Sequence, residues 1–145
     1  MAASFTSILD VQNLDDIAPP KPLPPGEYEA IIDGLPEHIQ QGRNDNYVFL
    51  FPCKLLRPLN VDPTELMESL NGRPLSELKF NWRMWDTPDA AYRIRTFLRD
   101  HLGITARSAG EAIAATQGKA LIVTIGHYTT KDGRVGSQIV STAHV

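Results

Sequence analysis

Aromatic and cationic side chains recur together along this chain, and together they could bind a flexible polyanion. Lys79, Arg83 and Trp85 stand at alternate positions of one short run, so a strand would place all three on the same face. Aromatic rings stack on nucleobases, which contributes roughly 1–3 kcal/mol per base, and cations hold phosphates. Three aromatic residues are candidates for stacking: Tyr47, Trp85 and Tyr128. Five cations are candidates for phosphate contacts: Arg43, Lys79, Arg83, Lys131 and Arg134.

These residue types also have a structural reading, because a β-rich core needs bulky rings. Four rings that alternate along two expected strands are assigned to the interior: Phe49, Phe51, Phe80 and Trp82. Tyr47 and Tyr128 fit either role, and the candidate cations could equally be solvated strand and turn residues. Three arginines on an expected helix are assigned to a solvent face: Arg93, Arg95 and Arg99.

Catalytic chemistry has no candidate in this sequence. The histidines show no ligand spacing: His38, His101, His127 and His144. The single cysteine, Cys53, has no partner for a disulfide or a metal site and suits a small core position. Phosphate-binding loops and nucleophile elbows do not occur. We therefore expect a protein that is not an enzyme and that holds no metal or cofactor.

Composition indicates one globular domain. Of 145 residues, 42% are hydrophobic and 21% are charged, and no apolar run approaches the length of a membrane span. A single cysteine favours a reducing compartment such as the cytoplasm, although a virion would also fit. The net charge is −3, but residues 1–37 hold seven acids and one base. An acidic leader thus precedes a mildly basic body, which could accept a polyanion on one side and repel it on another.

The last segment predicts a β-hairpin. Residues 119–128 and 134–142 are rich in β-branched side chains, and Asp132-Gly133 lies between them. Asp-Gly between such runs is typical of a tight turn, because glycine accepts a positive φ.

Three further strands and a helix precede this hairpin. Thr87 and Pro88 suit the start of a helix expected over 88–102, which Gly103 ends. The strands are expected over residues 27–34, 47–56 and 78–85. Three strands, a helix and a hairpin form the order of a five-stranded OB barrel. We therefore expect a mainly β fold with helices, a five-stranded OB-like barrel in residues 26–145.

Two short helices and a loop interrupt this order. Asp62 and Pro63 favour an inserted helix over 61–70, and Ser108 begins another that Gly118 ends. Residues 38–46 are polar and predict a loop between the first two strands.

Residues 1–25 are interpreted as an arm outside the barrel. Five prolines in residues 19–25 exclude helix and ladder pairing and favour an extended polyproline segment. Residues 4–17 before them show weak helical spacing of apolar side chains: Phe5, Ile8, Leu9, Leu14 and Ile17. Four of these side chains are costly to leave in water: Phe5, Ile8, Leu9 and Ile17. The arm should therefore dock, either on its own domain or on a second copy in a homo-oligomer.

Three short motifs resemble small OB-type proteins encoded in the replication and recombination regions of bacteriophages. The motifs are PLPPGEY at 22–28, FLRDHLGI at 97–104, and the Gly118-Lys119 pair that opens the final hairpin. The resemblance covers roughly residues 20–144. It implies single-stranded DNA binding without base specificity, in the host cytoplasm. Many such proteins end in an acidic tail that recruits partners, whereas this chain ends STAHV.

Two functions of different classes follow as expectations. The first is sequence-independent binding of single-stranded DNA in phage replication or recombination. The alternative is a virion structural protein, such as a capsid decoration or cement subunit, whose arm contacts its neighbours. An inhibitor of a host system is neither favoured nor opposed by the sequence.

Overall fold

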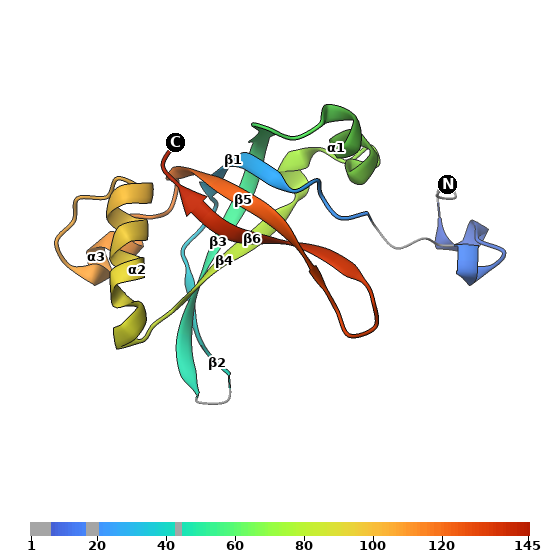
Figure 1. Ribbon diagram of the computed structural model, residues 1–145. Coiled ribbons are helices and arrows are strands. Elements are labelled where there is room, and N and C mark those ends of the chain that lie inside the picture. Colours follow the sequence, from blue (N-terminus) through green and yellow to red (C-terminus); the bar gives the residue numbers. More distant parts are fainter. Residues whose placement is uncertain (1–6, 17–20, 43–44) are drawn as a thin grey trace.

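The computed structural model describes residues 7–16, 21–42 and 45–145, and an antiparallel sheet dominates them (Figure 1). The strands are β1 (Gly26–Ile32), β2 (Glu37–Gln41), β3 (Asn46–Pro58), β4 (Lys79–Trp85), β5 (Ala120–Thr129) and β6 (Val135–Ala143). The α-helices are α1 (Pro63–Leu70), α2 (Ala91–Thr96) and α3 (Ala109–Ala114). The fold is thus mainly β with helices, as the sequence predicts.

β3 organises the sheet, because it is long enough to pair with three strands. Of its 13 residues, those from Val48 to Lys54 pair with β4 along one edge. Along the other edge, the first half of β3 pairs with β2 and the second half with β1. β1 then pairs with β5, and β5 pairs with β6. The order is therefore β2–β3–β1–β5–β6, with β4 attached to β3.

This sheet differs from the predicted five-stranded barrel in two respects. First, it is not closed: β4 and β6 approach each other, but no strand pairing joins them within the described residues. Second, it has a sixth strand, β2, in the segment 38–46 that the sequence predicts as a loop. Pro36 interrupts the chain after β1, and Glu37 then resumes pairing with the first half of β3. Because the residues of β2 are mostly polar, they carry no apolar alternation that would predict a strand.

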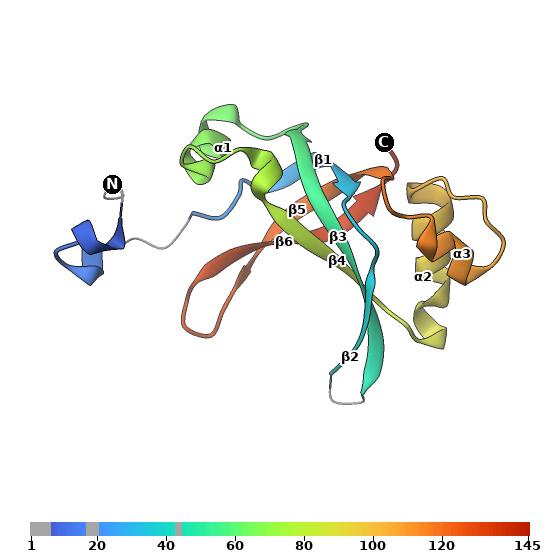
Figure 2. The ribbon, with the colours of Figure 1, turned by 180° about the vertical axis from the view of Figure 1, so that it is seen from behind.

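The core combines side chains of the inward face of the sheet with side chains of the helical segment that follows β4. Figure 2 shows this segment beside one end of the sheet. Tyr28, Phe51 and Phe97 are fully buried there, and the rings of Phe51 and Phe97 lie 5.0 Å apart. The other rings assigned to the core pack against it while partly buried: Phe49, Phe80 and Trp82. The assignment of these side chains to the interior is confirmed.

The helix predicted over 88–102 is present as one continuous run in three geometries. A 3-10 turn (Pro88–Ala90) leads into α2, and a π turn (Phe97–His101) follows it. The N–H of Leu102 donates to the carbonyl of Phe97 at 3.0 Å and closes this run. Gly103, at a φ of +69°, then ends it.

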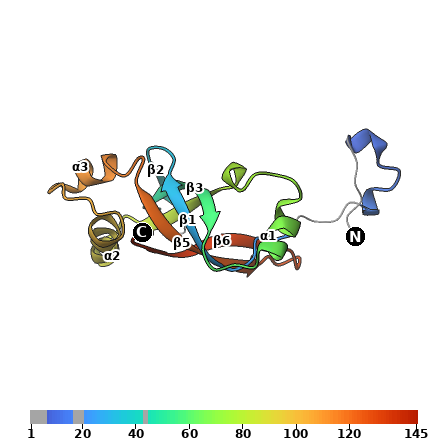
Figure 3. The ribbon, with the colours of Figure 1, turned by 90° about the horizontal axis from the view of Figure 1, so that it is seen from above.

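The two short helices begin as their capping residues predict. Asp62 accepts a hydrogen bond from the N–H of Thr64 at 2.8 Å, and Pro63 occupies the first position of α1. Ser108 accepts from the N–H of Glu111 at 3.1 Å and starts α3. Figure 3 shows α2 and α3 together at one end of the molecule and α1 toward the other.

The arm is anchored on its own domain at its inner end. The N–H of Leu23, a buried residue, donates to Ser137 Oγ at 2.8 Å. The hydroxyl of Tyr28 donates to the carbonyl of Pro24 at 2.7 Å, and burial raises the pKa of Tyr28 to about 12, so it stays a donor. The hydroxyl of Ser69 on α1 donates to the carbonyl of Pro22 at 2.9 Å.

The outer part of the arm does not share this anchoring. Residues 7–16 form two 3-10 turns, Ile8–Asp10 and Leu14–Asp16, and lie apart from the sheet in Figures 1 to 3. Four residues that carry the sequence argument for the arm lie outside the described residues: Phe5, Ile17, Pro19 and Pro20. Among the described residues of the arm, contacts with its own domain are therefore observed for residues 21–24, where Lys21 also pairs with Glu68 on α1 at 3.4 Å.

Candidate functional site

β4 presents candidate binding residues on its outward face. Lys79, Arg83 and Trp85 are exposed at alternate positions, as their spacing predicts. The intervening residues pack against the core: Phe80, Trp82 and Met84. β4 thus has two different faces: the outer face carries cationic side chains and the indole of Trp85, and the inner face is apolar.

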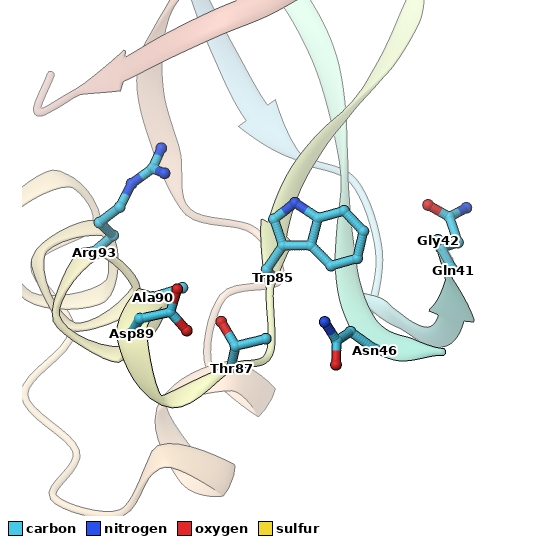
Figure 4. Close-up of a pocket in the computed structure, with 8 residues that line it drawn as sticks. All are labelled: Gln41, Gly42, Asn46, Trp85, Thr87, Asp89, Ala90 and Arg93. Carbon is cyan, nitrogen blue, oxygen red and sulfur yellow. The ribbon is translucent and has the colours of Figure 1, made fainter. Parts of the chain in front are cut away.

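Trp85 stands at the centre of a pocket at the end of β4 (Figure 4). The pocket has a volume of about 360 Å³ and lies between the β2–β3 hairpin and the start of the helical run. Trp85 is 36% exposed. In Figure 4 its indole lies between Arg93 on one side and Gln41 and Asn46 on the other. The ring is therefore accessible to a ligand yet held among neighbouring side chains.

Gly42 allows the indole to come close to the hairpin. The φ of Gly42 is +88°, a conformation that residues with a side chain rarely adopt. A Cβ at this position would lie 3.3 Å from Cη2 of Trp85, which is tighter than an ordinary contact. Gly42 therefore helps to set the position of the Trp85 ring.

A second pocket, of about 240 Å³, adjoins the first, because the two share Trp85, Ala90 and Arg93. It adds Trp82, Arg83 and Met84 from β4 and Val140 from β6. The exposed indole of Trp85 and two guanidinium groups therefore line one continuous surface. We refer to Arg83, Trp85 and Arg93 as the Trp85 surface.

The charges divide unequally between the two pockets. The first contains Asp89 as well as Arg93, so its charges offset each other, and it suits an uncharged ring. The second contains Arg83 and Arg93, and no carboxylate of the described residues lines it. It suits a phosphate, which is attracted by paired guanidinium groups.

The sequence alone does not single out Arg93, which it assigns to a solvent face. Only Asp86 and Thr87 separate β4 from the helical run, so the first turns of that run stay beside the end of the strand. This short connection is the signal that could have placed Arg93 near Trp85. Gln41 is missed for a different reason, since it lies in the segment predicted as a loop.

Lys79 lies at the far end of β4, where it already has a partner. Its Nζ is 2.9 Å from Oδ2 of Asp33. The hydrogen bond from Lys79, followed by its charge, lowers the pKa of Asp33. Because both side chains are exposed, water screens the pair, and a phosphate could still compete for Lys79.

Tyr47 lies on the opposite face of the sheet from Trp85. In the β3–β4 register, the residue paired with Trp85 is the next one after Tyr47, so the two side chains point in opposite directions. Tyr47 stacks on His38, with ring centroids 4.7 Å apart. His38 also stacks on Phe49 at 4.6 Å, and its Nε2 lies 2.8 Å from Oδ2 of Asp86. Tyr47 thus belongs to a separate aromatic cluster.

Tyr128 and two of the candidate cations lie on the β5–β6 hairpin, which projects separately from the β2–β3 hairpin in Figure 1. Tyr128 is 46% exposed and crosses Gly136 on the neighbouring strand, where any Cβ would collide with its ring. Arg134 Nε is 2.9 Å from Oδ2 of Asp132, and Lys131 is exposed in the turn. These residues do not join the Trp85 surface.

Of the eight candidates, the structure therefore brings Arg83 and Trp85 together, with Lys79 farther along the same face. Arg43 lies outside the described residues.

Metal sites and a reactive cysteine find little support among the described residues. They contain no group of three or more histidine, cysteine, aspartate or glutamate side chains that could hold a metal ion. Cys53 is buried in β3, and burial raises the pKa of its thiol to about 12, which suits the predicted core role rather than a nucleophile. No helix in the described ranges is long and apolar enough to cross a membrane.

Comparison with known proteins gives no family assignment. No protein-family model matches the chain, and no curated protein is significantly similar to it in sequence.

Proposed function

We propose that the protein binds single-stranded DNA without base specificity and that the Trp85 surface makes the central contact. The observation that carries this proposal is an accessible indole on the same surface as Arg83 and Arg93. A base would stack on Trp85 in the first pocket while an adjacent phosphate meets the two guanidinium groups in the second. Stacking tolerates any sequence, because every base has a π face.

The order of the strands supports an OB-like interpretation of the sheet. β1 and β2 both pair with the same edge of β3, so they can be counted as one interrupted strand. The order of elements is then β-β-β-α-β-β, and a closed barrel would require pairing between the edge strands β4 and β6. OB folds bind oligonucleotides on the face of their second and third strands, which correspond here to β3 and β4. In this interpretation, the Trp85 surface would lie on that face. The β5–β6 hairpin, with Tyr128, Lys131 and Arg134, would supply peripheral contacts.

We place this activity in phage replication or recombination in the host cytoplasm, because the short motifs of the chain resemble proteins from those regions. A protein of this kind would coat displaced strand and release it when copying or annealing requires it. Such a role needs affinity for backbone and stacked bases rather than catalysis.

Salt dependence tests the proposal directly. The affinity for a fluorescent oligo-dT, measured by anisotropy over a range of salt concentrations, should fall with a log–log slope of about −0.7 for each phosphate neutralised. Arg83→Ala should make this slope shallower by about one such increment. Arg73→Ala, which removes an exposed arginine next to α1, should leave it unchanged. Salt-independent affinity, or equal affinity for duplex DNA, would contradict single-strand binding.

A virion structural role is a second proposal, and the outer arm favours it. Ile8, Leu9 and Leu14 expose apolar surface that a neighbouring subunit in a particle could cover. Mass spectrometry of purified particles would detect the protein at stoichiometric levels if this role holds. Its absence from particles would eliminate the role and leave DNA binding untouched.

A further inference from the structure

The outer arm exposes more apolar surface than a solvated segment needs. Ile8 is 55% exposed, Leu9 is 91% exposed and Leu14 is 72% exposed. All three lie within residues 7–16, which also hold three aspartates and no lysine or arginine. Clustered apolar side chains of this kind usually mark an interaction site, because leaving them in water is costly. The outer arm is therefore an acidic segment with an unpartnered apolar face.

A groove of complementary character lies at the other end of the molecule. It has a volume of about 320 Å³ and runs between the helical segment after β4 and α3. Ile94, Leu98 and Ile113 supply apolar surface to its lining. Three arginines also line it: Arg95, Arg99 and Arg107. The acid in this lining, Asp86, is paired with His38 at 2.8 Å. We refer to this feature as the α2–α3 groove.

We propose that the outer arm of one copy docks in the α2–α3 groove of a second copy. Leu9 and Leu14 would enter the apolar part of the groove, and Asp15 would face its arginines. Both the apolar surface and the opposite charges favour this pairing. Nothing in this contact requires DNA, so it stands apart from the proposed function.

The position of the anchor favours docking between copies rather than within one. The inner end of the arm is fixed beside α1, because the hydroxyl of Ser69 donates to the carbonyl oxygen of Pro22 at 2.9 Å. Figures 1 and 3 place residues 7–16 at the α1 end of the molecule and the helices α2 and α3, between which the groove lies, at the opposite end. The described part of the outer arm therefore lies away from the groove of its own chain. A contact between different surfaces of two copies is head-to-tail, so it can extend to a third copy.

The mass of the full-length protein in solution tests this contact without DNA. By light scattering after size exclusion, the mass should rise above that of a monomer as the protein concentration increases. Leu9→Ser in the arm and Arg107→Glu in the groove should each give a monomer at every concentration. Both positions are exposed, so the folded domain should persist, which circular dichroism would check. Leu35→Ser and Lys119→Glu alter comparably exposed residues elsewhere and should behave as the wild type.

Mixing the two monomeric variants distinguishes a head-to-tail contact from a symmetric one. The Leu9→Ser protein retains an intact groove, and the Arg107→Glu protein retains an intact arm. Their mixture should therefore form a dimer and nothing larger, since the dimer has no intact arm and groove left to extend it. The charge swap Asp15→Arg with Arg107→Glu should restore association that either change alone weakens.

Several results would overturn the proposal. These are a wild type that is monomeric at all concentrations, an oligomer that survives both Leu9→Ser and Arg107→Glu, a control that dissociates as fully as these variants, or a mixture that stays monomeric. Loss of oligo-dT binding bears only on the proposed function, because the oligomer is measured in the absence of DNA.

Discussion

Trp85 is the side chain on which DNA binding should depend most. Replacing it with alanine removes the stacking surface, so the affinity for oligo-dT should fall by roughly 1–3 kcal/mol, which is about fivefold to 150-fold. Tyr47→Ala removes an exposed ring of the same strand pair on the opposite face and should change the affinity little. Anisotropy titrations of both variants at one salt concentration make the comparison. A loss confined to Tyr47→Ala would place the interface on the other face.

The contrast between Trp85 and Tyr47 shows what residue patterns can predict. Alternation along a strand correctly groups Arg83 with Trp85 and separates Trp85 from the core-facing Met84. It cannot say how the register of β3 and β4 places Tyr47 relative to Trp85, because register is set by pairing between distant segments. The contribution of Arg93 depends on a helix returning beside the strand, which is also a tertiary effect.

The β2–β3 hairpin positions the indole through Gly42, and this can be tested by substitution. Gly42→Ala places a side chain at a φ of +88° and brings its Cβ within 3.3 Å of Trp85. We expect a loss of about 1 kcal/mol in the free energy of unfolding, together with weaker oligo-dT binding as the ring moves. Gly110→Ala is the matched control, since nothing lies within 4 Å and the position is helical.

Denaturant unfolding followed by circular dichroism gives the two stabilities. The control should be neutral or gain roughly 0.5–1 kcal/mol, because alanine favours a helix more than glycine does. Equal stability and equal affinity for Gly42→Ala and the wild type would show that the hairpin does not hold the ring.

Elements with local signals are predicted well, and elements that depend on pairing are not. Asp62, Ser108 and Pro88 mark the starts of three helical segments, because capping and the fixed φ of proline act within one turn. The final hairpin follows from Gly133, which adopts a φ of +86°. β2 is not predicted, because its stability comes from pairing with the first half of β3 rather than from its own residues. The open seam between β4 and β6 is likewise a property of the assembled sheet.

The two proposals together predict how the protein covers a long strand. Copies linked arm to groove should bind adjacent sites cooperatively, as is usual for proteins that coat single strands. Leu9→Ser should bind a short oligonucleotide, which holds one copy, as tightly as the wild type. On a long strand it should bind with a lower Hill coefficient, whereas Leu35→Ser should retain cooperativity. Equal cooperativity in the wild type and Leu9→Ser would separate assembly from DNA binding.

The unpaired edges of β4 and β6 suggest a second role for the charged residues on these strands, which is to prevent aggregation. An unpaired strand edge exposes backbone donors and acceptors that can pair with a strand of another molecule. Lysine and arginine side chains on the edge strand disfavour such pairing. Lys79 and Arg83 stand on β4, so they are suited to keep the protein soluble as well as to attract a nucleic acid. Replacing both Lys79 and Arg83 with neutral residues should then cause the protein to precipitate before any defect in DNA binding could be measured. The contribution of each cation to DNA binding is therefore best measured with single substitutions.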